Sequence, residues 1–141
     1  MDSRQLADRI AELIFNKKGY DVKILDLRSI TTIADFFVIC TADSDTQVKA
    51  IADEIDKSLR DEGIRLWHKE GYQSLNWVLV DFVDVVAHVF KKESREYYNL
   101  EKLWSDAPTF NMEDPLLKKS TAANTASAPK KRGRPKKIKS E

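Results

Sequence analysis

The run from Phe36 to Thr41, Phe-Phe-Val-Ile-Cys-Thr, constrains the fold more than any other feature of this sequence. Apolar and β-prone residues follow one another there without a charged interruption. A strand with one face in water alternates apolar and polar side chains, whereas a strand covered on both faces is apolar throughout. The run therefore predicts a central strand in a sheet that has material packed on each side.

Two amphipathic helices are predicted on either side of this strand in the sequence. The first begins at Ser3, a residue type that caps helices, and ends at Gly19. The second begins at Ser44, which precedes Gln47 with the spacing of a capping box, and stops at Gly63. The apolar residues that recur with helical spacing are Leu6, Ala7, Ile10, Leu13 and Ile14 in the first helix, and Val48, Ile51, Ala52, Ile55 and Leu59 in the second.

The remaining segments predict further strands and one more helix. Residues 22–27 alternate imperfectly, residues 64–67 are compatible with a short strand, and residues 77–82 and 84–90 are two β-rich runs separated only by Val83. The last two runs are typical of a hairpin or a bent ribbon.

A final helix is predicted to begin at Ser94 and to be closed by Pro108, with Tyr97, Leu100 and Leu103 among its apolar residues. The resulting element order is α-β-β-α-β-β-β-α. It predicts an α/β protein of the α+β kind with a mixed sheet, in which some strands join by hairpins and at least one by a helical crossover.

The length and the single cysteine indicate one small domain in a reducing compartment. A chain of 141 residues has room for one core. Cys40 has no partner for an internal disulfide, so we expect it to be buried as a small apolar residue. No apolar run is long enough for a signal peptide or a membrane span. These features predict a cytoplasmic protein without membrane association.

Charge is distributed unevenly along the chain. Residues 1–114 hold 15 Lys and Arg against 22 Asp and Glu, whereas residues 115–141 hold nine against one. Apolar residues are also sparse after residue 114, so ordering that stretch would cost entropy that little burial offsets. We expect one domain over residues 1–110 and a disordered basic tail over residues 111–141.

The tail contains the sequence Arg132-Gly-Arg-Pro135, which resembles the AT-hook core that places arginines in a narrow DNA minor groove. Any run of Lys and Arg also binds phosphate backbones through counterion release, so contact with ribosomal RNA, or a merely solubilising role, is the alternative. The candidate nucleic-acid-binding residues are Lys130, Lys131, Arg132, Arg134, Lys136 and Lys137.

Asp81 and Asp84 form the most plausible acid pair for chemistry, because they lie where one predicted strand ends and the next begins. Two carboxylates at that place can hold a divalent ion, as in magnesium-dependent nucleotidyltransferases. Such enzymes share a Gly-Ser step before an Asp-x-Asp pair, and this sequence contains no Gly-Ser. Solvated acids in a turn are the competing interpretation.

The two histidines, His68 and His88, do not indicate a metal site, because neither has a Cys or His at ligand spacing. His88 follows Asp84 by four residues in a predicted strand, which places them about 13 Å apart at roughly 3.3 Å per residue. A hydrogen-bonded acid-base pair is therefore excluded, and a buried His88 is favoured over a catalytic base.

Large rings gather in the second half of the chain. Trp77, Leu79 and Asp81 fall on one side of a strand by simple alternation, and Tyr98 and Trp104 follow nearby in the sequence. The rings can be core residues. Trp and Tyr are also enriched in binding hot spots, and acids around them would suit a basic partner.

Several co-linear motifs closely resemble the ribosomal silencing factor family RsfS, also called Iojap-like. They are Trp77-Val-Leu-Val-Asp-Phe-Val-Asp-Val-Val-Ala-His-Val-Phe90 and Arg95-Glu-Tyr-Tyr-Asn-Leu-Glu-Lys-Leu-Trp-Ser-Asp-Ala107, together with Ala34 to Thr41 and Ser44 to Gln47, which resemble the family's first motif. The resemblance covers residues 3–107.

The resemblance implies a nucleotidyltransferase-like fold without transferase activity or cofactor, in the bacterial cytoplasm. It also implies binding to the large ribosomal subunit through ribosomal protein L-fourteen, which blocks joining of the small subunit and represses translation. Free family members are implied to form homodimers. One departure from the family is Val83, where Gly is common before the acid that matches Asp84. A β-branched residue disfavours positive φ, so we expect an extended bend there.

The leading hypothesis is therefore a non-catalytic translation repressor that acts by steric exclusion. The alternatives are a magnesium-dependent nucleotidyltransferase using the acid pair, and a nucleic-acid-binding accessory protein acting through its tail. The candidate partner-binding residues are Trp77, Leu79, Asp81, Asp84, His88, Tyr98 and Trp104.

Overall fold

The structure, a computed structural model, describes residues 1–116. The disordered tail was expected over residues 111–141; residues 111–116 are described, whereas residues 117–141, with the six basic residues named in the tail, lie outside the described part of the chain. The elements in chain order are α1 (Ser3–Asn16), β1 (Tyr20–Asp26), β2 (Phe36–Ala42), α2 (Asp45–Asp61), β3 (His68–Glu70), β4 (Trp77–Asp81), β5 (Val85–Lys91), α3 (Lys92–Tyr98), α4 (Leu100–Leu103) and β6 (Thr109–Asn111).

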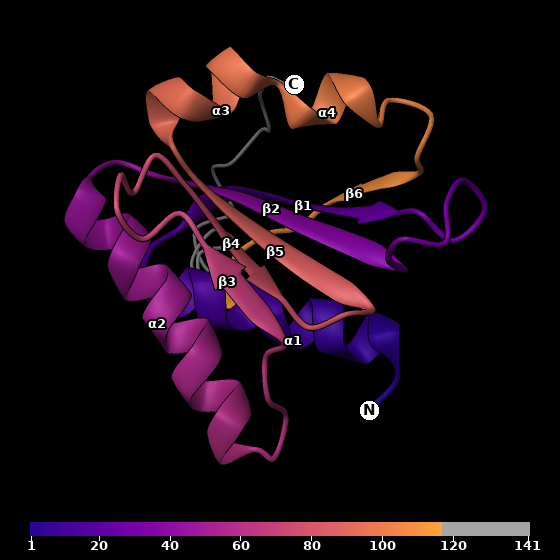
Figure 1. The fold of residues 1–141 in the computed structure, drawn as a ribbon, viewed down its shortest axis with the longest axis horizontal. Helices are drawn as coiled ribbons and strands as arrows, with labels where there is room; N and C mark the ends of the chain where they lie inside the picture. The colour runs from indigo at the N-terminus through magenta and orange to yellow at the C-terminus, as the bar shows by residue number, and fades with distance from the viewer. Residues whose placement is uncertain (117–141) are drawn as a thin grey trace, which may run out of the picture.

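One six-stranded mixed sheet organises the domain, with strand order β3-β4-β5-β2-β1-β6 (Figure 1). The central pair, β2 and β5, is parallel, and its register runs from Phe36 opposite Val85 to Ala42 opposite Lys91. All other pairs are antiparallel. Every residue of β2 is buried, which confirms the central strand expected from its apolar run. The predicted α+β class with a mixed sheet is confirmed.

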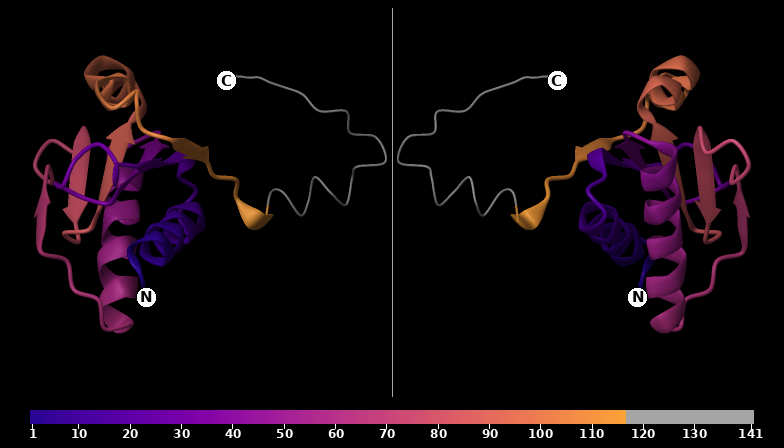
Figure 2. Two further views of the ribbon diagram at one scale, coloured as in Figure 1. Left: turned by 90° about the vertical axis from the view of Figure 1, so that its right-hand side faces the viewer. Right: turned by 90° about the vertical axis from the view of Figure 1, so that its left-hand side faces the viewer.

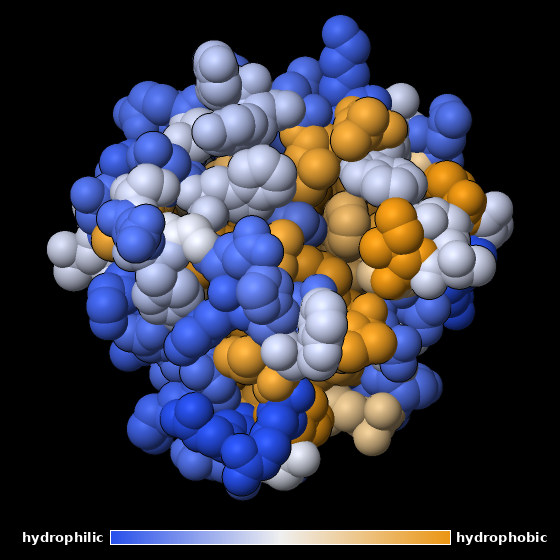
Figure 3. All heavy atoms as spheres, in the orientation of Figure 1, coloured by the Kyte–Doolittle hydropathy of each residue, from blue (hydrophilic) through white to orange (hydrophobic). Residues whose placement is uncertain are grey.

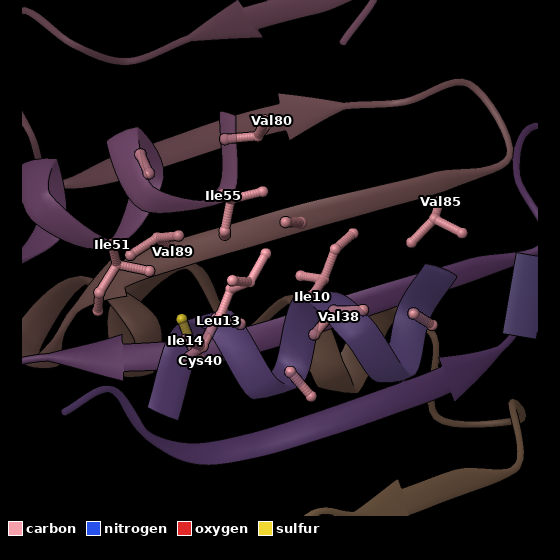
Figure 4. Packing of buried hydrophobic residues seen from close by; sticks show 14 of the residues in the cluster. Ile10, Leu13, Ile14, Val38, Cys40, Ile51, Ile55, Val80, Val85 and Val89 are labelled. Atoms are coloured by element: carbon pink, nitrogen blue, oxygen red, sulfur yellow. The ribbon is translucent and has the colours of Figure 1, made fainter. Parts of the chain in front are cut away.

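Helices α1 and α2 cover one face of the sheet, as the two side views show (Figure 2). Their apolar stripes interdigitate with every second residue of the central strands, as Figure 4 shows for Ile10, Ile51 and Val89. Cys40 is fully buried in this layer, and burial raises the pKa of its thiol to about 12. It is therefore the buried, unreactive residue that we expected.

The N-terminus of α1 begins one residue earlier than predicted. Asp2 rather than Ser3 is the N-cap, and its carboxylate accepts a hydrogen bond from the Gln5 backbone N–H at 2.8 Å. The Gln5 side chain accepts in return from the Asp2 N–H at 2.9 Å. Gln5 stands three residues after Asp2, so only Asp2 can close this reciprocal capping box.

The short strand expected over residues 64–67 was wrong, and the strand lies at His68–Glu70 instead. The reason is the end of α2, where the Ile64 N–H donates to the Leu59 carbonyl at 2.8 Å and the Gly63 N–H to that of Arg60 at 3.0 Å. These two bonds form a Schellman motif, which uses Ile64 to terminate the helix. Pairing with β4 begins only at His68.

The last predicted helix is divided in two and starts earlier than Ser94. α3 begins at Lys92, and Asn99 then adopts a left-handed conformation with φ 48° and ψ 54° before α4 starts. Asn tolerates this region better than most residues. The chain continues into β6, an unpredicted edge strand that pairs with β1 and spans the boundary expected at residue 110.

The connection between β4 and β5 is a tight hairpin, so the extended bend expected at Val83 was wrong. Val83 has φ 77°, and the Asp84 N–H donates to the Phe82 carbonyl at 3.0 Å, which forms a γ-turn. The Asp81 carboxylate accepts from the Val83 N–H at 2.7 Å. Sheet pairing on both sides of the turn therefore imposes a conformation that valine disfavours by itself.

Candidate functional site

The second face of the sheet carries apolar side chains that no long helix covers. We call it the open face. It is the face turned to the viewer in Figure 3, where hydrophobic side chains gather in a band across the middle and right of the molecule. The buried members of its cluster are Leu25, Leu27, Ala34, Phe37, Ile39, Val86, Phe90 and Ala107, and the half-buried members are Trp77, Leu79, Leu100 and Trp104.

The short helices α3 and α4 cover only one end of the open face (Figure 1). Arg95 anchors them to the sheet, because its Nη1 donates to the Asp21 carbonyl at 2.6 Å and to Thr41 Oγ1 at 2.7 Å. Its Nε donates to Glu101 at 2.9 Å, and Glu101 also pairs with Lys23. Burial raises the pKa of Glu101, but hydrogen bonds and charge from Arg95 and Lys23 outweigh it and hold the pKa at about 2.

Trp77 is the centre of an aromatic cluster on this face. Its ring stacks on Phe90, the residue opposite it in β5, with centroids 4.9 Å apart, and contacts Tyr98 of α3 at 5.0 Å. Its Nε1–H donates to His88 Nδ1 at 3.1 Å. Strand pairing and the return of α3 over the sheet therefore fix the position of a large ring that is still partly exposed.

A second group of rings continues the cluster toward α4. Phe37 of β2 packs edge to face against His88, with centroids 4.5 Å apart, and against Trp104 at 5.7 Å. Tyr98 is 49% exposed and Tyr97, which packs against it, is 81% exposed. The rings thus form a continuous path from the buried sheet to the surface.

The structure brings together five of the seven predicted partner-binding residues: Trp77, Leu79, His88, Tyr98 and Trp104. Trp77, Leu79 and Trp104 are half-buried, and His88 is only 3% exposed, so it supports the surface from below. This burial confirms the expectation of a buried histidine. Burial also lowers the pKa of His88 to about 3.

Asp81 and Asp84 lie at the other end of β4, away from the aromatic cluster. The Asp81 carboxylate binds the backbone of the hairpin turn, and Asp84 is exposed. Residues 1–116 contain no group of three His, Cys, Asp or Glu side chains arranged to hold a metal ion. In the pairing of β3 with β4, Asp81 lies opposite His68 and Leu79 lies opposite Glu70. Residues directly opposite each other share a face of the sheet, so the carboxylates of Asp81 and Glu70 both lie on the open face at this edge.

Reasoning from the sequence missed the two phenylalanines that support the site, Phe37 of β2 and Phe90 of β5. Phe37 and Phe90 support the cluster, but both lie in continuous apolar runs whose two faces look alike. Tyr97 and Leu103 were predicted among the apolar residues of a single helix. They are instead exposed, because Asn99 breaks that helix and turns α4 relative to α3. The residue opposite Trp77 in the sheet, Phe90, could be identified only from the register of the β4–β5 hairpin.

An α+β sheet with helices packed on one face and an aromatic, acid-edged face left open is an architecture typical of proteins that bind macromolecular partners. In the described part of the chain, no helix is long and apolar enough to cross a membrane.

The family comparisons agree with this class. The sequence profile of the family described as "Ribosomal silencing factor during starvation" matches residues 1–139, and the chain belongs to this family. It is 46% identical over 113 residues to ribosomal silencing factor RsfS of Halalkalibacterium halodurans, covering 80% of this chain and 97% of the relative. The corresponding protein of Bacillus subtilis is 43% identical, with 80% and 96% covered.

Structural similarity leads to the same family. A crystal structure of a Chromobacterium violaceum protein superposes with a TM-score of 0.73 at 35% sequence identity, and the match covers 74% of this chain and 88% of that protein.

Proposed function

We propose that this protein silences ribosomes by binding the large subunit through ribosomal protein L-fourteen and sterically blocking the small subunit. The observation that carries the proposal is the open face, where Trp77, Trp104 and Tyr98 form an aromatic surface that the chain itself leaves partly uncovered. Clustered aromatic rings of this kind are typical of binding hot spots. The choice of the ribosome as the partner is supported by relatives that are named ribosomal silencing factors.

The mechanism is exclusion rather than chemistry, and it takes place in the cytoplasm. A bound module of this size needs only to occupy the surface that the small subunit would contact. The carboxylates of Glu70 and Asp81 at the edge of the open face suit a basic protein surface, and they would increase the association rate. No cofactor takes part in this mechanism.

Free in solution, the protein is proposed to form a homodimer that covers the open face. A partly uncovered apolar surface built from Trp77, Leu79 and Trp104 favours self-association in water. Sedimentation equilibrium of the full chain tests this: a dimer is expected, and a monomer at micromolar concentration contradicts it. Mixing with ribosomal protein L-fourteen then shows whether the partner and the second copy compete.

Sucrose-gradient sedimentation with separated ribosomal subunits tests the main proposal. The full chain is expected to migrate with the large subunit alone and to prevent its association with the small subunit. Trp77→Ala and Trp104→Ala should each weaken binding, with a loss of about 2 kcal/mol for a ring that is a hot spot. Trp67→Ala is a matched control, because Trp67 is 70% exposed and belongs to neither apolar cluster.

Two results would reject this assignment. Normal large-subunit binding by folded Trp77→Ala and Trp104→Ala proteins would show that the open face is not the contact surface. Heat of binding in a calorimetric titration with nucleotide and magnesium would instead favour the nucleotidyltransferase alternative. The basic tail is proposed to add ribosomal RNA contacts through residues 130–137, and deletion of residues 117–141 tests it separately.

A further inference from the structure

His88 has an unusual set of contacts for a core residue. It lies in β5 on the open face, opposite Leu79 of β4 and Ile39 of β2. Phe37 packs edge to face on its ring. One ring nitrogen, Nδ1, accepts the Trp77 indole N–H at 3.1 Å, and the other, Nε2, is buried without a hydrogen-bond partner in residues 1–116.

The Trp77 hydrogen bond determines the tautomer of His88. An indole nitrogen can only donate, so Nδ1 must be unprotonated and the proton of the neutral ring must reside on Nε2. Nε2–H is then a buried donor without an acceptor. Because burial lowers the pKa of His88 to about 3, the ring stays neutral and Nδ1 remains an acceptor at physiological pH.

A purely structural role does not explain a histidine at this position. A leucine has a similar volume, fits a position surrounded by Phe37, Leu79 and Phe90, and removes the unpaired Nε2–H, although it also removes the acceptor of the Trp77 indole N–H. Burying an unpaired N–H destabilises a fold. The compensating contribution of His88 is therefore its bond to Trp77, the half-buried ring that the surface presents.

We propose that His88 is a positioning residue for the partner surface, which fixes the orientation of the Trp77 indole through the Nε1–Nδ1 hydrogen bond. Without this bond the indole is held only by its stacking on Phe90 and its tilted contact with Tyr98, and neither contact requires the N–H edge of the indole to point toward His88. The inference rests on the proposed function in one respect, namely that Trp77 contacts the partner. An indole held in one orientation binds with a smaller loss of side-chain entropy.

Nuclear magnetic resonance of the full chain tests the hydrogen bond without any ribosome. The indole N–H of Trp77 is assigned with a Trp77→Phe variant, and its exchange with water is compared between the native protein and His88→Leu. Exchange is expected to accelerate about tenfold or more and the proton resonance to move upfield, as for a lost hydrogen bond. His88→Asn is expected to restore slow exchange, because Asn Oδ1 stands the same number of bonds from Cα as Nδ1. His68→Leu, which alters the other histidine, should change neither signal.

Binding to isolated large subunits provides the functional test. His88→Leu is expected to unfold at about the same urea concentration as the native protein, because it loses the Trp77 hydrogen bond together with the unpaired Nε2–H, and yet to bind about tenfold more weakly. His88→Asn should bind within about twofold of the native protein even where its stability falls. A structural residue would show the reverse pattern, in which stability and affinity fall together and Asn does not rescue.

The inference is overturned if the Trp77 indole signal of folded His88→Leu matches that of the native protein. It is also overturned if His88→Leu frees the indole but binds the large subunit with native affinity. Failure of the native protein to bind large subunits would reject the proposed function. In that case the exchange measurement would still decide whether His88 fixes the indole.

Discussion

Replacing Val83 separates backbone strain from side-chain packing at the β4–β5 hairpin. Val83 has φ 77°, where a side chain with a Cβ costs about 1–2 kcal/mol relative to glycine. Its side chain is exposed, at 55%, but not fully, so a direct comparison of Val with Gly would mix backbone strain with the loss of the remaining side-chain contacts. Val83→Ala and Val83→Gly differ by a single methyl group. We expect Val83→Gly to be more stable than Val83→Ala by about 1 kcal/mol.

The order of these two variants is the reverse of the usual one. In an ordinary strand position, glycine is less stable than alanine by roughly 0.5–1 kcal/mol. Urea unfolding followed by tryptophan fluorescence measures both, and a difference of this size shifts Tm by about 4–8 °C for a domain of this length. Lys69 in β3 is exposed and serves as the control, because Lys69→Gly should be less stable than Lys69→Ala. An alanine variant at position 83 as stable as the glycine variant would refute the positive φ.

Three further predictions follow from the buried charges, the buried histidine and the tail. The depressed pKa of His88, about 3 against an ordinary 6.5, means that the unfolded chain takes up the proton first, so stability is lost as pH falls below about 6.5. Urea unfolding should show a loss of about 2 kcal/mol between pH 7 and pH 5, which His88→Leu lacks; an equal loss in that variant contradicts the assignment. Arg95→Ala should cost about 2 kcal/mol of stability, because Glu101 loses one of its two cationic partners, and an unchanged urea midpoint would contradict the anchor. Deleting residues 117–141 should leave co-sedimentation with the large subunit intact but weaken binding to free nucleic acid, whose salt dependence should lose a slope of about −5 for six phosphate contacts; loss of ribosome binding would make the tail primary.

Helices α1 and α2 and strands β2, β4 and β5 were predictable because each is specified by a local pattern. The apolar residues of α2 repeat with helical period between Ser44 and Gly63, and both ends are where those residues predicted them. The failures lie where two local signals compete. Ile64 has strand propensity, but it is needed to complete the helix stop after Gly63. Asn99 permits a left-handed turn. The contact between Arg95 and Glu101 across that turn could be identified only from the folded structure.

The candidate site was predictable in its residues but not in its arrangement. Alternation along β4 correctly placed Trp77, Leu79 and Asp81 on one face. It did not reveal that the Asp81 carboxylate binds the hairpin turn rather than belonging to the aromatic surface. It also did not reveal that His88 and Trp77, in neighbouring strands, share a hydrogen bond.

The run from Phe36 to Thr41 determined by itself that this chain builds a sheet with a central strand, because continuous apolar character is stable only when both faces of a strand are covered. The sequence motifs also determined the family. Only the tertiary structure decided that one face is covered by long helices and the other is left open with Trp77 held on it. Which face a side chain meets depends on strand register and helix breaks, and these are determined by contacts between segments far apart in the sequence.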